Sequence, residues 1–257
     1  KYIALTIDDG LCRPGNGGGG DEDVQQSNSM VQEVCQLLEK YQQAKATFFV
    51  CTEYTSAEDA AVLLSQGHEL GNHLRRDVSG FYCNLSRENF EQELIETNQH
   101  LEQILESCSE KNQRQQNQVK WFRAPQGRMS VAMKEVLKEH GMVNVMGDSY
   151  CDDWCFMEAL NATDDAEKIN QETERVANLM TRQLQSGSIA IFHMPQRGFR
   201  EAGLLALEKL LQQCQQQDIR CVTVSQLVEL SRSTTMEATI QRIGRLETKM
   251  QNTLIEQ

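Results

Sequence analysis

The sequence predicts a single α/β domain built as a closed or nearly closed parallel barrel. Short apolar runs typical of buried strands alternate with segments whose apolar residues recur at helical spacing, and this alternation predicts a parallel sheet. At 257 residues the chain has the length of one barrel-sized domain. Polar side chains directly follow several predicted strands, at the edge of the sheet where barrel enzymes carry their chemistry. We therefore expect a functional site at this edge.

The expected strands are runs of apolar and β-branched residues that end where polar or turn-forming residues begin. In order, they are residues 2–7, 46–51, 68–72, 119–122, 142–146, 188–192 and 219–224. The segments between them show helical periodicity and capping residues, which predict helices at residues 24–41, 56–66, 86–108, 129–140, 158–185 and 202–216. Residues 11–23 carry a run of glycines but lack the Lys-Ser/Thr pair of a phosphate-binding loop, so we expect a flexible loop there.

The last part of the chain predicts an additional element. Residues 236–257 place apolar side chains on one side of a helix. We therefore expect one domain over residues 1–230 and an amphipathic helical extension over residues 231–257. Such a helix can pack on the body of the protein or on a partner.

The composition narrows the classes of partner. The formal charge of −12 argues against nucleic acid or an anionic membrane as the main partner and suits neutral or cationic ligands. No run of about 18 apolar residues occurs, so no membrane span is expected. The chain begins with Lys1 rather than methionine, which suggests a processed or trimmed start.

The cysteines and two glycosylation sequons indicate a secreted, extracellular protein. Nine cysteines without paired Cys-x-x-Cys spacing favour disulfides over a zinc module, with at least one thiol left unpaired within the chain. The sequons are Asn84-Leu85-Ser86 and Asn161-Ala162-Thr163, although such triplets also arise by chance.

Two adjacent carboxylates follow the first predicted strand. Asp8 and Asp9 stand at its end, and Gly10 marks a turn. Carboxylates held this close repel each other, so a bound cation, a cationic neighbour or a shared proton must offset them. The alternative is a helix N-cap or a solvated turn.

Further polar motifs follow in a fixed order after Thr6-Ile7-Asp8-Asp9-Gly10. They are His73-Leu74-Arg75-Arg76-Asp77, Arg123-Ala124-Pro125-Gln126-Gly127, Asp148-Ser149-Tyr150-Cys151-Asp152-Asp153-Trp154 and Ile189-Ala190-Ile191-Phe192-His193. Over residues 2–230 this order resembles the polysaccharide deacetylases of carbohydrate esterase family four. Those enzymes have a distorted β/α barrel and remove N- or O-acetyl groups from glycans, so the resemblance implies that residues 1–230 form a deacetylase catalytic domain.

The first two motifs carry the implied metal site. The family opens with Thr-Phe-Asp-Asp-Gly, which makes Asp8 the general base and Asp9 a metal ligand. The second family motif is His-Ser/Thr-x-x-His, and Asp77 stands here in place of its second histidine. An i, i+4 spacing on a helical turn places the side-chain ends of His73 and Asp77 on one side. The ligands that the resemblance implies are therefore Asp9, His73 and Asp77. Two carboxylates favour Mn²⁺, with Zn²⁺ or Co²⁺ as alternatives. The alternative is that Asp77, in place of the histidine, marks a site that has lost its metal.

The remaining motifs supply the other implied roles. Arg123 orients Asp8 as a planar guanidinium holding a carboxylate. Gln126 stands where the family has tyrosine; it keeps the backbone donor to the oxyanion but not the substrate-facing ring. Asp153 is placed to orient a histidine, and Trp154 is placed to form a wall of the substrate groove. His193 is the implied general acid that protonates the leaving amine.

These residues together predict a metal-dependent deacetylase of N-acetylglucosamine polymers, with chitin or its oligomers as the favoured substrate. Peptidoglycan and acetylxylan are the alternative substrates. A catalytically silent glycan-binding protein on the same scaffold is the competing class. A third hypothesis is hydrolysis of small cyclic amides on a related barrel, which predicts a closed pocket where a polymer needs an open groove.

Overall fold

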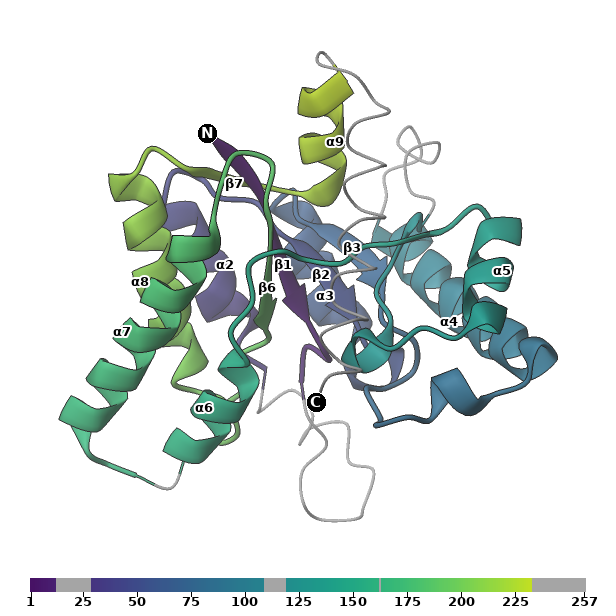
Figure 1. The fold of residues 1–257 in the computed structure, drawn as a ribbon, viewed down its shortest axis with the longest axis horizontal. Helices are drawn as coiled ribbons and strands as arrows, with labels where there is room; N and C mark the ends of the chain where they lie inside the picture. The colour runs from purple at the N-terminus through teal and green to yellow at the C-terminus, as the bar shows by residue number, and fades with distance from the viewer. Residues whose placement is uncertain (13–28, 109–118, 162, 233–257) are drawn as a thin grey trace.

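The computed structural model describes residues 1–12, 29–108, 119–161 and 163–232 (Figure 1). Its centre is a sheet of parallel strands in the order β5-β4-β3-β2-β1-β6, with β7 paired to the beginning of β1. The strands are β1 (Tyr2–Asp8), β2 (Thr47–Val50), β3 (Glu69–Asn72), β4 (Trp121–Phe122), β5 (Val143–Asn144), β6 (Ile189–His193) and β7 (Arg220–Val222). The parallel sheet confirms the predicted fold class.

The sheet curves into a half-barrel because the chain after β5 reaches the opposite edge. Ser149 forms a parallel bridge with Ala190 of β6, and the Ile191 N–H donates to the Ser149 carbonyl at 2.9 Å. Gly147 permits this approach, since a Cβ there would lie 2.4 Å from a side-chain carbon of Ile191. The two ends of the sheet, β5 and β6, are therefore linked through residues 147–149.

Helices surround the sheet, with α7 and α8 on one side and α4 and α5 on the other (Figure 1). The helices are α2 (Val31–Lys40), α3 (Ala57–Ser65), α4 (Arg87–Cys108), α5 (Val131–Glu139), α6 (Asp153–Leu160), α7 (Ala166–Gln183), α8 (Gly203–Gln216) and α9 (Val224–Arg232). Short 3₁₀ helices are η1 (Thr52–Tyr54), η2 (Tyr82–Asn84) and η3 (Pro125–Gly127). Among the described residues, no helix combines the length and the apolarity that crossing a membrane requires.

Strand β1 shows how the fold positions its polar residues. Successive side chains of a strand point to opposite faces of the sheet. Ile3, Leu5 and Ile7 belong to the main core under the surrounding helices, whereas Ala4 belongs to a second apolar cluster with residues of β2, β6 and α9. Asp8 lies on the same face as Ala4, so its carboxylate ends up inside the half-barrel at the carboxyl-terminal edge.

Several predicted elements differ from the structure. The helix expected over residues 158–185 is two helices, α6 and α7, because the Asp165 side chain accepts from the backbone N–H groups of Glu167 and Lys168 and starts α7 anew. The domain boundary predicted at residue 230 falls within α9. The glycine-containing loop, apart from its first two residues, and the extension beyond residue 232 lie outside the described residues, so the predicted division into domains stays a prediction.

The structure shows none of the predicted disulfides, since all nine cysteines are free thiols, and disulfide formation stays a prediction. Five of them are buried, and three of these, Cys35, Cys214 and Cys221, belong to the main apolar core, a common use of cysteine in proteins. The five buried cysteines are Cys12, Cys35, Cys51, Cys214 and Cys221.

Asp148 follows the strand predicted at residues 142–146, which predicts a position at the carboxyl-terminal edge of the sheet, and this prediction is wrong. Its carboxylate accepts from the Ile189 N–H at 2.8 Å, so it lies beside the start of β6 rather than at the carboxyl-terminal edge. Its role there is to bind the crossing segment to β6.

Candidate active site

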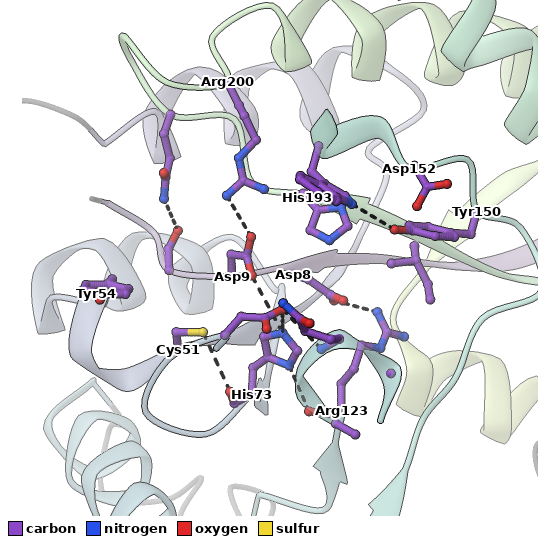
Figure 2. A pocket seen from close by; sticks show the side chains of 18 of the residues that line it. Asp8, Asp9, Cys51, Tyr54, His73, Arg123, Tyr150, Asp152, His193 and Arg200 are labelled. Atoms are coloured by element: carbon purple, nitrogen blue, oxygen red, sulfur yellow. Dashed lines mark hydrogen bonds and ion pairs between the residues drawn. The ribbon is translucent and has the colours of Figure 1, made fainter. Parts of the chain in front are cut away.

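A cavity of about 920 Å³ lies at the carboxyl-terminal ends of the strands. Eight of the nine site residues predicted from the sequence line it, and several of them converge in Figure 2. They are Asp8, Asp9, His73, Asp77, Arg123, Gln126, Trp154 and His193. The ninth, Asp153, is buried and contacts His193. The structure therefore brings the predicted residues together from four strand ends and the α6 and η3 segments.

Asp8 and Arg123 form a buried ion pair inside the half-barrel. Arg123 Nη1 donates to Asp8 Oδ1 at 2.6 Å and also reaches Thr6 Oγ1 at 2.6 Å, while Nε donates to the Val145 carbonyl at 2.8 Å. The Arg123 side chain is only 2% exposed. Such charge-assisted bonds fix the orientation of the Asp8 carboxylate.

His193 and Asp153 form a second pair on the opposite side of the cavity. His193 Nδ1 donates to Asp153 Oδ1 at 2.9 Å, and the backbone N–H of His193 donates to Asp153 Oδ2 at 2.8 Å. Burial lowers the pKa of His193, but the charge and hydrogen bond of Asp153 outweigh it and raise the pKa above its usual value. This arrangement favours a protonated imidazole whose Nε2 is available to the cavity.

Between these pairs lies a cluster of side chains that could bind a metal ion, namely Asp9, His73 and Asp77, and two of their oxygen atoms have no hydrogen-bond partner. His73 Nε2 is 3.8 Å from Asp9 Oδ1 and 3.6 Å from Asp77 Oδ2, both longer than a hydrogen bond. The other ring nitrogen, Nδ1, donates to the Arg123 carbonyl at 2.9 Å, which leaves Nε2 as a lone-pair donor in the neutral ring. Asp9 Oδ1 and Asp77 Oδ1 are buried without any hydrogen-bond partner.

The charged groups around this cluster determine whether His73 and Asp9 carry a proton. Burial lowers the pKa of His73, but Asp77, Asp8 and Asp9 raise it to about 9. For Asp9, burial raises the pKa, whereas Arg200, His193 and His73 lower it to about 2. Asp9 is therefore ionised at neutral pH, and His73 carries a proton when no other cation is present.

The groups of this cluster are of the kinds that bind a divalent cation. Carboxylate oxygens of Asp9 and Asp77 lie near His73 Nε2, each of these two carboxylates has one buried oxygen without a partner, and carboxylate and imidazole are common ligands of divalent metals. The Nδ1 hydrogen bond of His73 is the kind of outer contact that orients a metal-bound histidine. Both predicted carboxylate ligands therefore lie 3.6–3.8 Å from His73 Nε2. Asp77 does not belong to the group of donor atoms that all lie within 4.8 Å of one another, which consists of Asp9, His73 and Cys51 among the described residues.

Two residues at this cluster were missed by the sequence analysis. The first, Arg200, follows β6, and its Nη2 donates to Asp9 Oδ2 at 2.7 Å (Figure 2). Its side chain is 6% exposed, so it forms a second buried arginine–carboxylate pair. Arg200 holds one oxygen of Asp9 and leaves the other facing His73. No motif surrounds this arginine that could have distinguished it from a solvated one.

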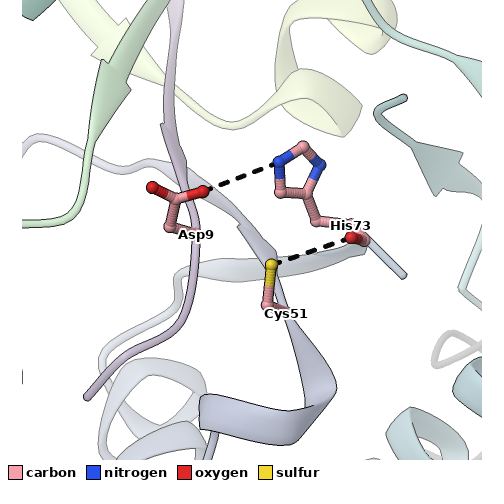
Figure 3. Close-up of side chains that lie close together, drawn as sticks. All are labelled: Asp9, Cys51 and His73. Carbon is pink, nitrogen blue, oxygen red and sulfur yellow. Dashed lines mark hydrogen bonds and ion pairs between the residues drawn. The ribbon is translucent and has the colours of Figure 1, made fainter. Parts of the chain in front are cut away.

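Cys51 is the second missed residue. It follows β2, and its Sγ lies within 4.8 Å of a carboxylate oxygen of Asp9 and a ring nitrogen of His73 (Figure 3). Burial raises the pKa of its thiol well above the usual value, and Asp9, Asp77 and Asp8 raise it further. Its place at the end of a strand neighbouring β1 is the signal that could have identified it.

The backbone at the site adopts rare conformations. Asp9, Leu74, Gln126 and Asp152 all have positive φ angles, at 83°, 60°, 54° and 53°. Non-glycine residues seldom adopt this region, and such residues often cluster at functional sites. At Gln126 the turn directs the backbone N–H to Asp77 Oδ2 at 3.3 Å. The donor that resemblance assigned to the oxyanion therefore contacts an expected metal ligand.

Aromatic side chains form one wall of the cavity. Trp154 is 38% exposed, and its Nε1 donates to the Tyr150 hydroxyl at 3.1 Å. The Tyr150 ring lies 6.1 Å from the His193 ring, measured between centroids. These two residues place apolar faces beside the candidate acid.

Known proteins resemble this chain in sequence. Residues 1–145 match the family model described as polysaccharide deacetylase. The chain is 26% identical over 232 residues to a peptidoglycan-N-acetylglucosamine deacetylase of Bacillus cereus, a match that covers 89% of this chain and 88% of the relative.

Solved structures show the same fold. A family 4 acetyl xylan esterase from Clostridium thermocellum, in complex with cobalt, has a TM-score of 0.63 at 22% identity and covers 90% of this chain and 92% of its own. A mutant CE4 pseudoenzyme with restored activity has a TM-score of 0.65 at 19% identity and covers 89% of this chain and 67% of its own.

Proposed function

The chain belongs to the polysaccharide deacetylase family, and on that premise we propose that it removes N-acetyl groups from polymers of N-acetylglucosamine, with chitin or its oligomers as the substrate. The observation that carries the proposal is the arrangement of two fixed acid–base pairs on either side of a cluster of unsatisfied metal donors. Hydrolysis of an amide needs a base for water, an acid for the departing nitrogen and an electrophile for the carbonyl. The cavity contains candidates for each.

In this mechanism Asp8 accepts a proton from the attacking water, and His193 donates a proton to the departing nitrogen. Arg123 holds Asp8 in one orientation at 2.6 Å. Asp153 fixes the tautomer of His193 and favours the charged ring that an acid requires. Each proton therefore has a defined donor or acceptor atom in the chain.

One divalent ion completes the proposed mechanism, with Asp9, His73 and Asp77 as its holders. When bound, such an ion supplies Lewis acidity that polarises the acetyl carbonyl. These three donors alone favour Mn²⁺ because two of them are carboxylates, while Zn²⁺ and Co²⁺ are alternatives. Arg200 contributes by neutralising the outer oxygen of Asp9.

The substrate class is supported by the shape and lining of the site. A cavity of about 920 Å³ with an exposed Trp154 at its rim suits a sugar chain that lies across the opening. The relative from Bacillus cereus is named for N-acetylglucosamine in peptidoglycan, which has the same acetylated amine as chitin. Peptidoglycan is therefore the alternative substrate, and acetylxylan tests whether an ester is accepted.

We propose an extracellular location because polymeric glycans of this kind lie outside the cell. Asn84 and Asn161, the asparagines of the two sequons, are exposed. Glycosylation of either asparagine in the native protein, detected by mass spectrometry, would support passage through a secretory pathway.

A second candidate function is glycan binding without hydrolysis. The ion pair between Arg200 and Asp9 favours it, because a fixed cation already neutralises the carboxylate that would attract a metal. Measured metal content separates the two functions. A protein that binds chitin oligomers but takes up no divalent ion would be a binding protein.

The direct test is acetate release from a panel of substrates by protein supplied with one equivalent of Mn²⁺, Zn²⁺ or Co²⁺. The panel contains chitin oligomers, peptidoglycan fragments, acetylxylan and a small cyclic amide. We expect the highest kcat/KM on chitin oligomers. Preference for peptidoglycan would change the proposed substrate but leave the proposed deacetylation in place. Activity confined to the cyclic amide would overturn the proposal.

A further inference from the structure

We propose that Cys51 is a fourth donor to the metal ion, beside Asp9, His73 and Asp77. The inference rests on the proposed function, since it concerns the same ion. It adds a sulfur ligand that neither the motifs nor the resemblance assigned. It also changes which ion the site prefers.

The geometry points to a shared ion. Cys51 Sγ, a carboxylate oxygen of Asp9 and a ring nitrogen of His73 all lie within 4.8 Å of one another (Figure 3). Typical bond lengths are about 2.3 Å from zinc to sulfur and about 2.0–2.1 Å from zinc to nitrogen. Small side-chain rotations therefore bring these donors to one ion.

The thiol has no strong competing interaction. Its Sγ lies 3.8 Å from the His73 carbonyl oxygen, which is a weak contact for a sulfur donor, and it forms no disulfide. The Cys51 residue is 1% exposed, so water does not surround it. The buried oxygens without partners, Asp9 Oδ1 and Asp77 Oδ1, are an independent sign that this cluster suits a cation.

Ligation exchanges one bond of the sulfur for another. The S–H bond of Cys51 breaks, its proton passes to solvent, and a sulfur–metal bond forms without any change of oxidation state. The donors Asp9, Asp77 and the thiolate then carry three negative charges around a divalent ion. The guanidinium of Arg200, 2.7 Å from Asp9, offsets the remaining charge.

A sulfur ligand favours softer ions. Thiolates select Zn²⁺ over Mn²⁺, and cobalt can take the place of zinc in such sites, whereas carboxylates suit Mn²⁺. Cys51 therefore reverses the preference that the other three donors give, and we expect the chain to bind Zn²⁺ and Co²⁺ more tightly than Mn²⁺.

Cobalt absorption tests this ligand without any enzymatic assay. One equivalent of Co²⁺ added to the chelated full chain is expected to give a near-ultraviolet thiolate-to-cobalt charge-transfer band. The band should persist in Cys12→Ser and disappear in Cys51→Ser and Cys51→Ala. Cys12 is the matched control because it is a buried thiol that lines the same cavity, with its Sγ 3.3 Å from the Tyr54 carbonyl.

Affinity measured by calorimetry provides the second readout. Loss of even an outer contact to a metal ligand costs about 10–100-fold in affinity, so we expect Cys51→Ser to weaken Zn²⁺ binding at least about tenfold. Binding of Mn²⁺ should change much less. Thermal unfolding of the chelated variants checks that each one is folded.

The outcomes separate the two proposals. If wild-type protein binds an ion but shows no charge-transfer band, and Cys51→Ser binds Zn²⁺ equally well, the sulfur ligand is refuted while the metal site stands. If neither wild type nor Cys12→Ser binds any divalent ion, the proposed function itself fails. A band that vanishes only with Cys51 establishes the ligand.

Discussion

The acid–base pairs and the metal cluster occupy the same cavity but differ in how closely their charged groups meet. Asp8 with Arg123, and His193 with Asp153, are joined at 2.6 and 2.9 Å. In the cluster, His73 stays 3.6–3.8 Å from its carboxylate neighbours, and two carboxylate oxygens have no partner. The chain therefore preorganises proton transfer by itself, whereas the cluster is complete only with a cation.

Three histidines with little exposed surface show a related contrast in their pKa values. Burial lowers the pKa of all three, but the carboxylates around His73 and His193 reverse the direction there. His68 has no such partner, and its pKa falls to about 4. Burial and the nearby positive charge of Lys45 thus keep His68 neutral, whereas the site carboxylates favour the charged ring at His73 and His193.

The largest expected effect is on the base. Asp8→Asn removes the proton acceptor and should lower kcat by about 10²–10⁴-fold, the usual contribution of general base catalysis. Metal affinity, measured by calorimetry, should stay near the wild-type value because Asp8 is paired with Arg123. Substantial activity in this variant would show that Asp8 is not the general base and that the acid–base pairs do not have the role proposed for them.

A smaller effect is expected at the acid. Asp153→Asn removes the charge that raises the pKa of His193, so that pKa should fall. Activity needs the protonated ring and declines as pH rises through this pKa. The alkaline limb of the kcat profile should therefore move to lower pH, with a loss of about 10²-fold at its optimum. An unchanged limb would assign the acid role to another group.

The unfolding free energy of the metal-free protein also distinguishes the acid–base pairs from the metal cluster. Asp8→Asn leaves a buried arginine without its charged partner and should cost about 2 kcal/mol of unfolding free energy. Asp77→Asn removes a carboxylate from the unsatisfied cluster and should cost less than about 1 kcal/mol. Urea unfolding of chelated proteins measures both. Equal losses would mean that the cluster is as well satisfied as the pairs.

A further effect, confined to acid pH, concerns His68. Its folded pKa of about 4 lies below the usual 6.5, so its contribution to stability is complete above pH 6.5 and is lost as pH falls toward 4. At pH 5.5 the loss is about 1 kcal/mol. His68→Gln should abolish this component of the acid dependence of unfolding, whereas His100→Gln, at an exposed position, should leave it intact.

The sequence predicted the fold and most of the residues that line the cavity because the ends of strands can be recognised in the sequence. Asp8, His73, Arg123 and His193 each end or follow an apolar run, and a parallel sheet collects such ends at one edge. The break between α6 and α7 was missed because it depends on the single capping residue Asp165.

Tertiary contacts account for the site residues that were missed. Arg200 and Cys51 carry no motif, and their importance comes from Asp9 and His73, which are distant in sequence. Asp148 follows β5 as expected, but a crossover to β6 rather than the strand edge determines its place. Local pattern predicts which face or edge a residue occupies; it does not predict which neighbour meets it there.

The most direct test of the account is acetate release from chitin oligomers by chelated protein, before and after one equivalent of Zn²⁺, Co²⁺ or Mn²⁺, with Asp9→Asn as the matched variant. We predict no release from the chelated protein, recovery with a stoichiometric ion, and neither ion uptake nor recovery in Asp9→Asn. Full release by metal-free protein, or ion uptake without any release from any N-acetylglucosamine polymer, would contradict metal-dependent deacetylation at this site.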